Sequence, residues 1–159
     1  MDGMTNRIEI RSARLEDLPI LLSFEQGIIQ AERPYDSTLK PDPISYYDIG
    51  EMIDSEDAEV AVAVLDGELI GSGYAKKTRS RHYVSPDDHA FIGFLFVKPE
   101  YRGHGVNRRV LDHLFAWAKA AGLPEVHLTV YPDNAPAIRA YEKVGFDPYL
   151  VEMRLNLED

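Results

Sequence analysis

The feature that most constrains the fold is a very apolar run that leads through a glycine-bearing turn into an amphipathic helix. The run is His89–Val97 (HAFIGFLFV), the turn contains Gly103 and Gly105, and the helix is predicted over Val106–Ala121. A strand without polar alternation belongs inside a sheet that is covered on both faces. The start of the following helix gathers free backbone N–H groups, and the helix dipole adds positive potential there. We therefore expect an α/β protein that binds a phosphate at the front of this helix.

The turn itself has the composition of a phosphate-binding loop. Gly103 and Gly105 can adopt backbone angles closed to other residues, and they place no side chain between the main chain and a pyrophosphate. Arg102 adds positive charge beside them. The alternative is a plain glycine turn that only joins strand to helix. The turn lacks the Gly-Lys-Ser/Thr ending of ATP-binding loops and the three-glycine dinucleotide fingerprint, so we expect a cofactor other than ATP or NAD.

The rest of the chain mixes strands and helices. Alternating or β-branched patterns predict strands at Arg7–Ser12, Glu59–Leu65, Glu68–Thr78, Glu125–Tyr131 and within Tyr149–Leu157. Helical spacing and capping residues predict helices from about Leu15, from Pro43 toward Ile53 with Asp42 as N-cap, and over Asn134–Val144. Asp66-Gly67 is a two-residue hairpin turn, and Gly122 and Gly145 end helices. We expect one domain over residues 1–159, with a mixed sheet and helices on both faces.

Charge and composition exclude several classes of partner. The chain has 27 acidic and 17 basic residues, so its formal charge of −10 argues against a nucleic-acid partner. Much of the excess lies in residues 32–68, either as a solvated face or as a field that attracts a cationic acceptor. There is no cysteine, and the five histidines lack metal-ligand spacing, so we expect no metal. No apolar run approaches the roughly 20 residues of a membrane span, and with no secretory signal we expect a cytoplasmic protein.

A second motif follows the helix and the next strand. It consists of Asn134, Ala137, Tyr141, Gly145 and Phe146, and the first motif consists of Val97, Pro99, Arg102, Gly103 and Gly105. In this order and spacing the two motifs resemble the GNAT superfamily of N-acetyltransferases. The resemblance implies the GNAT fold, a single mixed and splayed sheet, and it implies acetyl-CoA as co-substrate. The implied reaction is acetyl transfer to a primary amine, either of a small molecule or of a peptide N-terminus.

The resemblance also assigns site residues. The pantetheine arm of coenzyme A would pair with the backbone of Leu95, Phe96 and Val97. The residues expected at the pyrophosphate are Arg102, Gly103, His104, Gly105, Val106 and Asn107. Asn107 departs from the family pattern, which most often has glycine or alanine there. Asn134 is expected to cap its helix or to bond the cofactor arm, and Tyr141 is the expected general acid for the departing thiolate.

Two points stay open at the level of sequence. The fourth predicted strand, His89–Val97, offers only Gly93 and Phe94 on its inward side, where many members of the family that the chain resembles carry a carboxylate. The general base for the protonated amine is therefore not fixed. The remaining candidates are Glu25, Glu32, Asp36, His89 and Tyr131. The missing strand-four carboxylate keeps a non-catalytic acyl-CoA sensor as the alternative function. Room for only one strand after Phe146 also leaves open a homodimer, in which a second subunit completes the acceptor wall.

Overall fold

The computed structural model describes residues 3–158, so residues 1, 2 and 159 of the expected domain lie outside the described residues. The helices are α1 (Gly3–Arg7), α2 (Leu18–Glu32), α3 (Ile49–Asp54), α4 (Val106–Ala120) and α5 (Ala135–Val144). The strands are β1 (Ile8–Ser12), β2 (Ala58–Leu65), β3 (Glu68–Arg79), β4 (Asp88–Val97) and β5 (Val126–His127). Short 3-10 turns lie at Leu15–Asp17, Arg33–Tyr35 and Pro99–Tyr101. The chain forms two compact units, one ending at Thr129 and one beginning at Val130.

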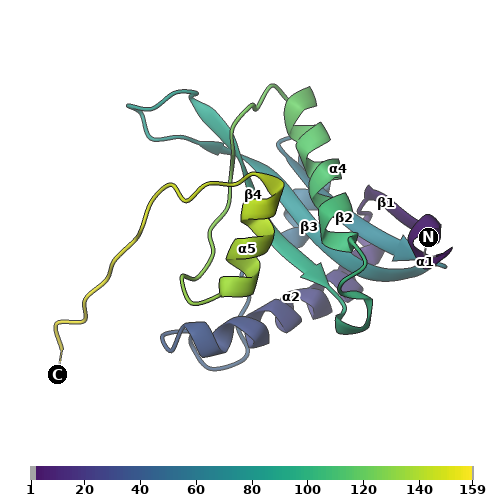
Figure 1. The fold of residues 1–159 in the computed structure, drawn as a ribbon, viewed down its shortest axis with the longest axis horizontal. Coiled ribbons are helices and arrows are strands. Elements are labelled where there is room, and N and C mark those ends of the chain that lie inside the picture. Colours follow the sequence, from purple (N-terminus) through teal and green to yellow (C-terminus); the bar gives the residue numbers. More distant parts are fainter. Residues whose placement is uncertain (1–2, 159) are drawn as a thin grey trace. The chain divides into compact units, whose positions relative to one another are not determined.

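The first unit contains a five-stranded sheet in the order β1-β2-β3-β4-β5 (Figure 1). The first three pairings are antiparallel, and β4 pairs with β5 in parallel. The predicted mixed sheet is therefore confirmed. The β2–β3 hairpin turns at Asp66 and Gly67, whose φ angles of 50° and 84° are those that a tight two-residue turn requires.

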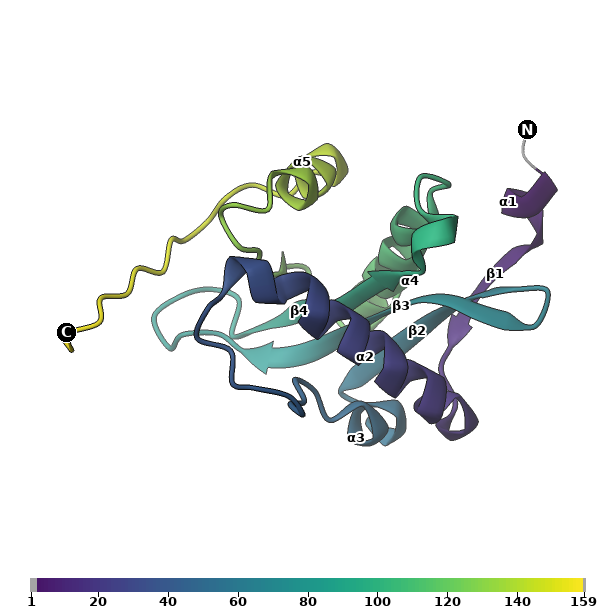
Figure 2. The same ribbon diagram turned by 90° about the horizontal axis from the view of Figure 1, so that it is seen from below.

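Helices cover both faces of this sheet, as predicted. Helices α2 and α3 lie on one face and α4 lies on the other (Figure 2). On the α2 and α3 side, buried apolar side chains form a core that comprises Leu21, Phe24, Ile49, Val60, Val62, Leu69, Tyr74 and Phe94. On the α4 side, the buried face of the helix is Val106, Val110, Leu111, Leu114 and Ala118.

Glycine in β3 sets how closely α4 approaches the sheet. A Cβ atom at Gly73 would lie 2.9 Å from Val110 Cγ1 and 2.9 Å from Leu95 Cδ2. Such a contact is too short to be tolerated without movement of the neighbours. The absent side chain therefore lets α4 and the second half of β4 pack against β3 at this point.

The structure corrects three expectations in the connecting regions. The helix predicted from Pro43 begins at Ile49, where Asp48 caps it by accepting a hydrogen bond from the Glu51 amide at 3.3 Å. Asp42 does not cap a helix, because its carboxylate accepts hydrogen bonds from Arg33 (2.6 Å) and Gln30. The predicted helix start was wrong because Asp42 and Asp48 are both possible N-cap residues, and the side chains of Arg33 and Gln30 bind Asp42 instead.

The other two corrections concern strands. The strand predicted over Glu125–Tyr131 is ordered as β5 only at Val126 and His127. The strand predicted within Tyr149–Leu157 is not present in the described chain, where residues 146–158 adopt no regular structure. Both patterns are those of strands, but a strand also needs a neighbour to supply its hydrogen bonds. The short helix α1 was not anticipated by the sequence pattern.

Candidate active site

The turn between β4 and α4 is fastened to the sheet on its β3 side. Lys98 Nζ lies 2.6 Å from Glu68 Oε1, and the Tyr101 hydroxyl donates to the other Glu68 oxygen at 3.3 Å. The Lys98 amide donates to the carbonyl of Ile70 at 2.8 Å. These contacts hold both ends of the 3-10 turn Pro99–Tyr101 against β3, so the position of the following glycines is fixed relative to the sheet.

The two glycines of the turn have the backbone conformation that the sequence predicts. Gly103 has φ +82° and Gly105 has φ +77°, both in the left-handed region that other residues rarely adopt. A Cβ atom added at either position would meet no atom of the described chain within 4 Å, so the space beside the main chain is open. This is the geometry that close approach of a ligand to the backbone requires.

The backbone amides in the first turn of α4 lie next to the open space beside Gly103 and Gly105. Gly105 is the N-cap residue, and no side chain of the described residues caps the helix. Gly105, with no side chain of its own, leaves the first N–H groups of the helix directed at solvent. Val106 is buried and anchors the first turn to the sheet, whereas Asn107 is half-buried. The arrangement suits a diphosphate, because unpaired N–H groups and the helix dipole both favour an anion.

Arg102 has one contact that the sequence did not reveal. Its Nε donates to the carbonyl of Val97 at 3.1 Å, and the residue as a whole is exposed. The hydrogen bond ties the guanidinium to the end of β4 and leaves its two terminal nitrogens on the exposed side. Positive charge therefore lies beside the glycine turn, as expected.

Strand β4 changes direction just before this turn. Between the pairs Ser72↔Phe96 and Tyr74↔Gly93 the register with β3 shifts, and Phe94 has φ +57°. This is a β-bulge, a distortion that is common beside active sites. The Ser72 hydroxyl donates to the Phe94 carbonyl at 3.1 Å, and the Phe94 ring is buried in the core. Both contacts hold the bulge in place. Neither Gly93 nor Phe94 carries a carboxylate that could act as the general base.

Beyond the bulge, β4 parts from β5. Within residues 3–129 the two strands pair only at Ala90↔Val126 and Phe91↔His127. Phe96 and Val97 pair with Ser72 and Gly71 of β3 on one side, Leu95 lies in the register shift, and none of the three has a strand partner in β5 on the other side. The backbone here is available for hydrogen bonds to an extended molecule such as a pantetheine arm.

The second unit contains the residues of the second motif on α5. Asn134 is the N-cap, and its Oδ1 accepts a hydrogen bond from the Ala137 amide at 3.3 Å. The capping role expected for Asn134 is therefore confirmed. At the other end, the amides of Gly145 and Phe146 donate to the Tyr141 carbonyl at 3.2 and 3.1 Å, which closes the helix around a left-handed Gly145. The Tyr141 ring packs edge-on to the Phe146 ring, with 6.0 Å between centroids.

The five candidate bases differ sharply in their surroundings. Glu25 is 1% exposed and accepts hydrogen bonds from the amides of Tyr46 (3.0 Å) and Tyr47 (2.8 Å), so it holds the segment before α3 in place. His89 is buried at the opposite end of β4 from the glycine turn, with its Nδ1 2.9 Å from Ser80 Oγ. Burial and the neighbouring His127 lower the pKa of His89.

The three other candidates divide between the two units. Asp36 accepts a hydrogen bond from the Thr38 amide at 3.0 Å and belongs to a local turn. Tyr131 belongs to the second unit. Glu32, the last residue of α2, has a raised pKa because burial outweighs the hydrogen bond from the Tyr46 side chain. A raised pKa brings a carboxylate closer to the range in which it exchanges protons near neutral pH.

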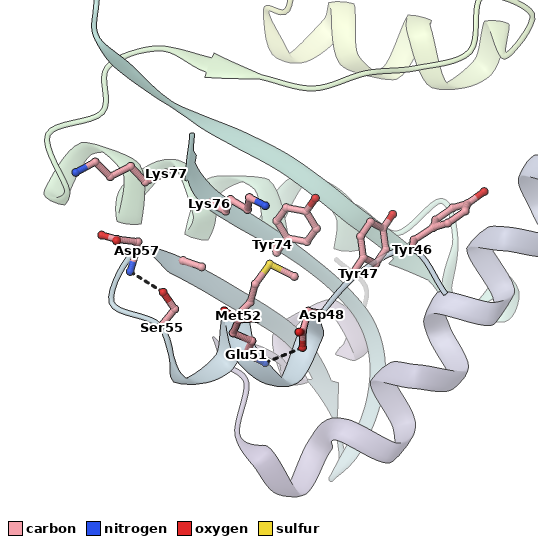
Figure 3. A pocket seen from close by; sticks show the side chains of 11 residues that line it. Tyr46, Tyr47, Asp48, Glu51, Met52, Ser55, Asp57, Tyr74, Lys76 and Lys77 are labelled. Atoms are coloured by element: carbon pink, nitrogen blue, oxygen red, sulfur yellow. Dashed lines mark hydrogen bonds between the residues drawn. The ribbon is translucent and has the colours of Figure 1, made fainter. Parts of the chain in front are cut away.

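A pocket of about 310 Å³ lies between α3 and β3 (Figure 3). Its lining residues are Tyr46, Tyr47, Asp48, Glu51, Met52, Ser55, Asp57, Ala58, Tyr74, Lys76 and Lys77. Asp57 and Lys77 lie at the opposite end of the pocket from Tyr46 and Tyr47 (Figure 3). The volume falls at the lower end of the range found for small-molecule sites.

The pocket reaches the bulge of β4 through its aromatic side chains. Tyr47 lies edge-on to Tyr74 at 5.3 Å and contacts the Phe94 ring at 5.5 Å between centroids. A Cβ atom at Gly93 would lie 2.6 Å from the Tyr74 hydroxyl, so that hydroxyl lies directly over β4. Burial raises the pKa of both tyrosines, which therefore stay neutral and keep their protons. Sequence reasoning missed both tyrosines, because their positions follow from the packing of a connecting segment and not from a motif.

The pocket carries three carboxylates and two ammonium groups. The carboxylates are those of Asp48, Glu51 and Asp57. All three belong to the acidic stretch 32–68, for which the sequence left open either a solvated face or a field for a cationic acceptor. Part of that stretch therefore faces a cavity.

Comparison with known proteins assigns the family. The family model described as acetyltransferase (GNAT) family matches residues 26–146. An aminoglycoside N(6')-acetyltransferase type 1 from Stenotrophomonas maltophilia is 31% identical over 113 residues, which cover 67% of this chain and 72% of that protein. The chain belongs to the GNAT acetyltransferase family. It is an N-acetyltransferase, and its transfer reaction depends on acetyl-CoA, as the two motifs predicted.

Solved structures agree on the fold. A predicted acetyltransferase from Clostridium acetobutylicum, solved with acetyl-CoA, has a TM-score of 0.70 at 19% identity and covers 94% of this chain and 96% of its own. The aminoglycoside N-acetyltransferase AAC(6')-Iy in complex with CoA has a TM-score of 0.72 at 19% identity, with coverage of 94% and 93%. These two structures contain acetyl-CoA and CoA, respectively.

Two other features are absent from residues 3–158. Among residues 3–158, no group of three or more histidines and carboxylates is arranged to hold a metal ion. In the same part of the chain, no helix combines the length and apolar character needed to cross a bilayer.

Proposed function

We propose that this N-acetyltransferase acetylates a primary amine of a small polycationic molecule of the aminoglycoside kind, bound in the pocket of Figure 3. The observation that carries the proposal is the contact of this pocket with the β4 bulge through Tyr74 and Gly93. A cationic amine is attracted to the exposed carboxylates of Asp48, Glu51 and Asp57, since opposite charges at short distance attract each other. The name of the relative from S. maltophilia supports the same acceptor class.

In this proposal acetyl-CoA binds along β4 and the front of α4. Arg102 and the main chain of Gly103, His104, Gly105, Val106 and Asn107 hold the pyrophosphate, and the backbone of Leu95, Phe96 and Val97 pairs with the pantetheine arm. The support is the positive φ of the two glycines, the uncapped first turn of α4 and the unpaired edge of β4. In the same proposal residues 1–159 are one N-acetyltransferase domain, and the resemblance of the second motif to the family assigns Asn134 to the cofactor arm and Tyr141 to the general acid.

The proposed mechanism is direct attack of the amine on the thioester carbonyl. The amine must first lose a proton, and Glu32 is the best of the five candidate acceptors, because its pKa is raised and its partner Tyr46 lines the pocket. The collapse of the tetrahedral intermediate breaks the carbon–sulfur bond, and Tyr141 gives its proton to the departing thiolate. The products are the N-acetylated amine and coenzyme A.

The test is thiol release from acetyl-CoA across a panel of acceptors. The panel contains an aminoglycoside, a linear polyamine, a free amino acid and a short peptide with a free N-terminus. The proposal expects the highest kcat/KM for the aminoglycoside. If the peptide had the highest kcat/KM, the acceptor would not belong to the aminoglycoside class. If no acceptor in the panel led to thiol release, the alternative function of a non-catalytic acyl-CoA sensor would be favoured.

Two matched variants test the pocket itself. Glu51→Gln removes a carboxylate that lines the pocket, and we expect the KM for the aminoglycoside to rise severalfold while the KM for acetyl-CoA stays the same. Glu9→Gln makes the same chemical change at an exposed position of β1, outside the pocket lining, and should change neither constant. Equal effects of the two variants would show that only overall charge matters.

A further inference from the structure

The hydroxyl group of Tyr74 is a polar group inside the core that has no hydrogen-bond partner in the described chain. The residue is 6% exposed, and its ring belongs to the apolar core that α2 and α3 form with the sheet. Among residues 3–158, no hydrogen bond to this hydroxyl is formed. A buried polar group that lacks a hydrogen bond costs free energy, so its presence in a native fold needs an explanation. A ligand that supplies the missing hydrogen bond is one such explanation.

The neighbouring Tyr47 differs from Tyr74 in this respect. The two rings lie edge-on in the same pocket, with 5.3 Å between their centroids (Figure 3). Burial raises the pKa of Tyr47, and a hydrogen bond with the backbone of Phe94 acts against this rise. Burial also raises the pKa of Tyr74, but there no hydrogen bond acts against it. Of these two hydroxyls, the protein therefore engages that of Tyr47 and leaves that of Tyr74 to the pocket.

The Tyr74 hydroxyl lies where the pocket meets β4. Tyr74 pairs with Gly93 across the two strands, and the register shifts next to this pair, at the bulge. The Cβ position of Gly93 is 2.6 Å from the hydroxyl oxygen, so this oxygen occupies the space over residue 93. The oxygen keeps contact with the pocket, because it is not among the unpaired side-chain atoms of the described chain that are fully enclosed. A molecule in the pocket can therefore reach it.

The proposed path of acetyl-CoA ends at the same point. With the pyrophosphate at the glycine turn, the pantetheine arm runs back along residues 95–97, away from that turn. The thioester at the end of the arm then comes next to Phe94 and Gly93. An amine held in the pocket meets the thioester carbonyl beside the Tyr74 hydroxyl, because this oxygen lies between the pocket and residue 93.

We propose that Tyr74 is a catalytic residue whose hydroxyl oxygen accepts a hydrogen bond from the reacting amine of the acceptor and directs the amine lone pair at the thioester carbonyl. The inference rests on the proposed function, because it takes the pocket between α3 and β3 as the acceptor site. The hydroxyl has lone pairs for this purpose and keeps its own proton throughout. The carbon–nitrogen bond forms and the carbon–sulfur bond breaks. The amine loses its protons to the base and to solvent, and the thiolate takes one from Tyr141.

This hydrogen bond grows stronger as the amine attacks. The free amine is neutral, but its nitrogen acquires positive charge while the carbon–nitrogen bond forms. Hydrogen bonds from a charged donor are roughly twice as strong as those between neutral groups. The hydroxyl therefore stabilises the transition state more than the ground state, and an interaction of this kind raises kcat instead of only lowering KM. The low polarity around the buried ring strengthens the effect.

Removal of this single oxygen by Tyr74→Phe tests the inference. The phenylalanine ring keeps the packing against Tyr47, and we expect kcat for the best amine of the acceptor panel to fall about 10- to 100-fold. The Kd for acetyl-CoA should not change. The free energy of unfolding in urea should not fall either, since the lost hydroxyl bonds to no group of the described chain.

Two matched variants accompany this test. Tyr83→Phe makes the same chemical change at a residue that is 68% exposed and lies outside the pocket lining, and its kcat should equal that of the natural chain. Tyr47→Phe removes the hydroxyl that the Phe94 backbone engages, and it should lower the free energy of unfolding. The comparison of Tyr47 with Tyr74 thus separates a hydroxyl that stabilises the fold from one that acts on the acceptor.

Unchanged kcat in Tyr74→Phe would overturn the inference. A loss of unfolding free energy or of acetyl-CoA affinity in this variant would do the same, because the hydroxyl would then have a structural role. The acceptor class is decided separately. If kcat falls but the peptide is the best acceptor, Tyr74 keeps its role and the aminoglycoside class is wrong. If Glu51→Gln raises the KM for the aminoglycoside while Tyr74→Phe leaves kcat unchanged, the pocket is the acceptor site and the role of Tyr74 is wrong. Turnover of no amine at all would overturn both proposals.

Discussion

An alanine at position 93 would bring a methyl group into steric overlap with the hydroxyl end of the Tyr74 ring. Its Cβ would lie 2.6 Å from the Tyr74 hydroxyl oxygen and 2.7 Å from Cζ, well below ordinary contact. The tyrosine cannot simply move aside, because it is 6% exposed and its ring packs edge-on to Tyr47. We therefore expect Gly93→Ala to push the tyrosine out of its position or to distort β4 beside the bulge.

The expected magnitude is that of overpacking a core. Inserting a methyl group into a well-packed site costs about 1–3 kcal/mol of unfolding free energy. For a chain of this size, a loss of about 2 kcal/mol corresponds to a fall of about 6 °C in Tm. Urea unfolding followed by circular dichroism measures the free energy directly, and a thermal scan gives the Tm.

Two further variants separate the clash from a general effect of alanine. Gly50 lies in helix α3, and the new methyl group of Gly50→Ala would lie 3.4 Å from Leu18 Cδ2, which is an ordinary contact. Since alanine also favours a helix over glycine, we expect no loss of stability in this variant. In a Tyr74→Leu background the ring is gone, and Gly93→Ala should then cost less than about 0.5 kcal/mol. An equal cost in both backgrounds would refute the close approach of Tyr74 to β4, and with it the link between the pocket and the bulge.

Three other perturbations address the cofactor, the acid and the sheet. Gly105→Ala should weaken acetyl-CoA binding at least tenfold in calorimetry, whereas Gly122→Ala, at a φ of +74° and therefore under similar strain, should lose stability but retain affinity. Tyr141→Phe should lower kcat about 100-fold with little change in acetyl-CoA affinity, and unchanged kcat would remove the assigned acid. Burial raises the pKa of Glu59, but hydrogen bonds, chiefly from His113 at 2.7 Å, outweigh burial and lower the pKa overall. The stability that Glu59 contributes is therefore fully present above the pKa of an unfolded glutamate, and it is lost as the pH falls through the lower pKa of the folded state. Urea titrations should show that Glu59→Gln destabilises the protein at pH 7 and makes little difference near pH 3.

The sequence alone was sufficient to predict those turns and helix ends that depend on only a few neighbouring residues. Asp66-Gly67 specified the hairpin, because few other pairs tolerate two successive positive φ angles. Gly105 and Gly145 marked a helix start and a helix end for the same reason, and Asn134 marked a start through its own capping hydrogen bond. The glycine turn and the second motif were sufficient to predict the family and the dependence on acetyl-CoA, since both depend on short-range spacing.

Features that depend on distant partners were decided only by the tertiary structure. The start of α3 moved to Asp48 because Arg33 and Gln30 engage Asp42 instead. The bulge at Phe94 depends on Ser72 in the neighbouring strand, and nothing in the sequence around Phe94 signals a positive φ.

The pocket between α3 and β3 and the C-terminal segment show the same division. Tyr47 and Tyr74 meet because Glu25 binds the backbone before α3, a contact between residues far apart in the sequence. The alternation in residues 149–157 indicates a strand, but a strand forms only where a partner supplies the other half of its hydrogen bonds. The sequence alone therefore determined local conformation and was sufficient to predict the family, and the packing of distant segments decided the shape of the pocket between α3 and β3.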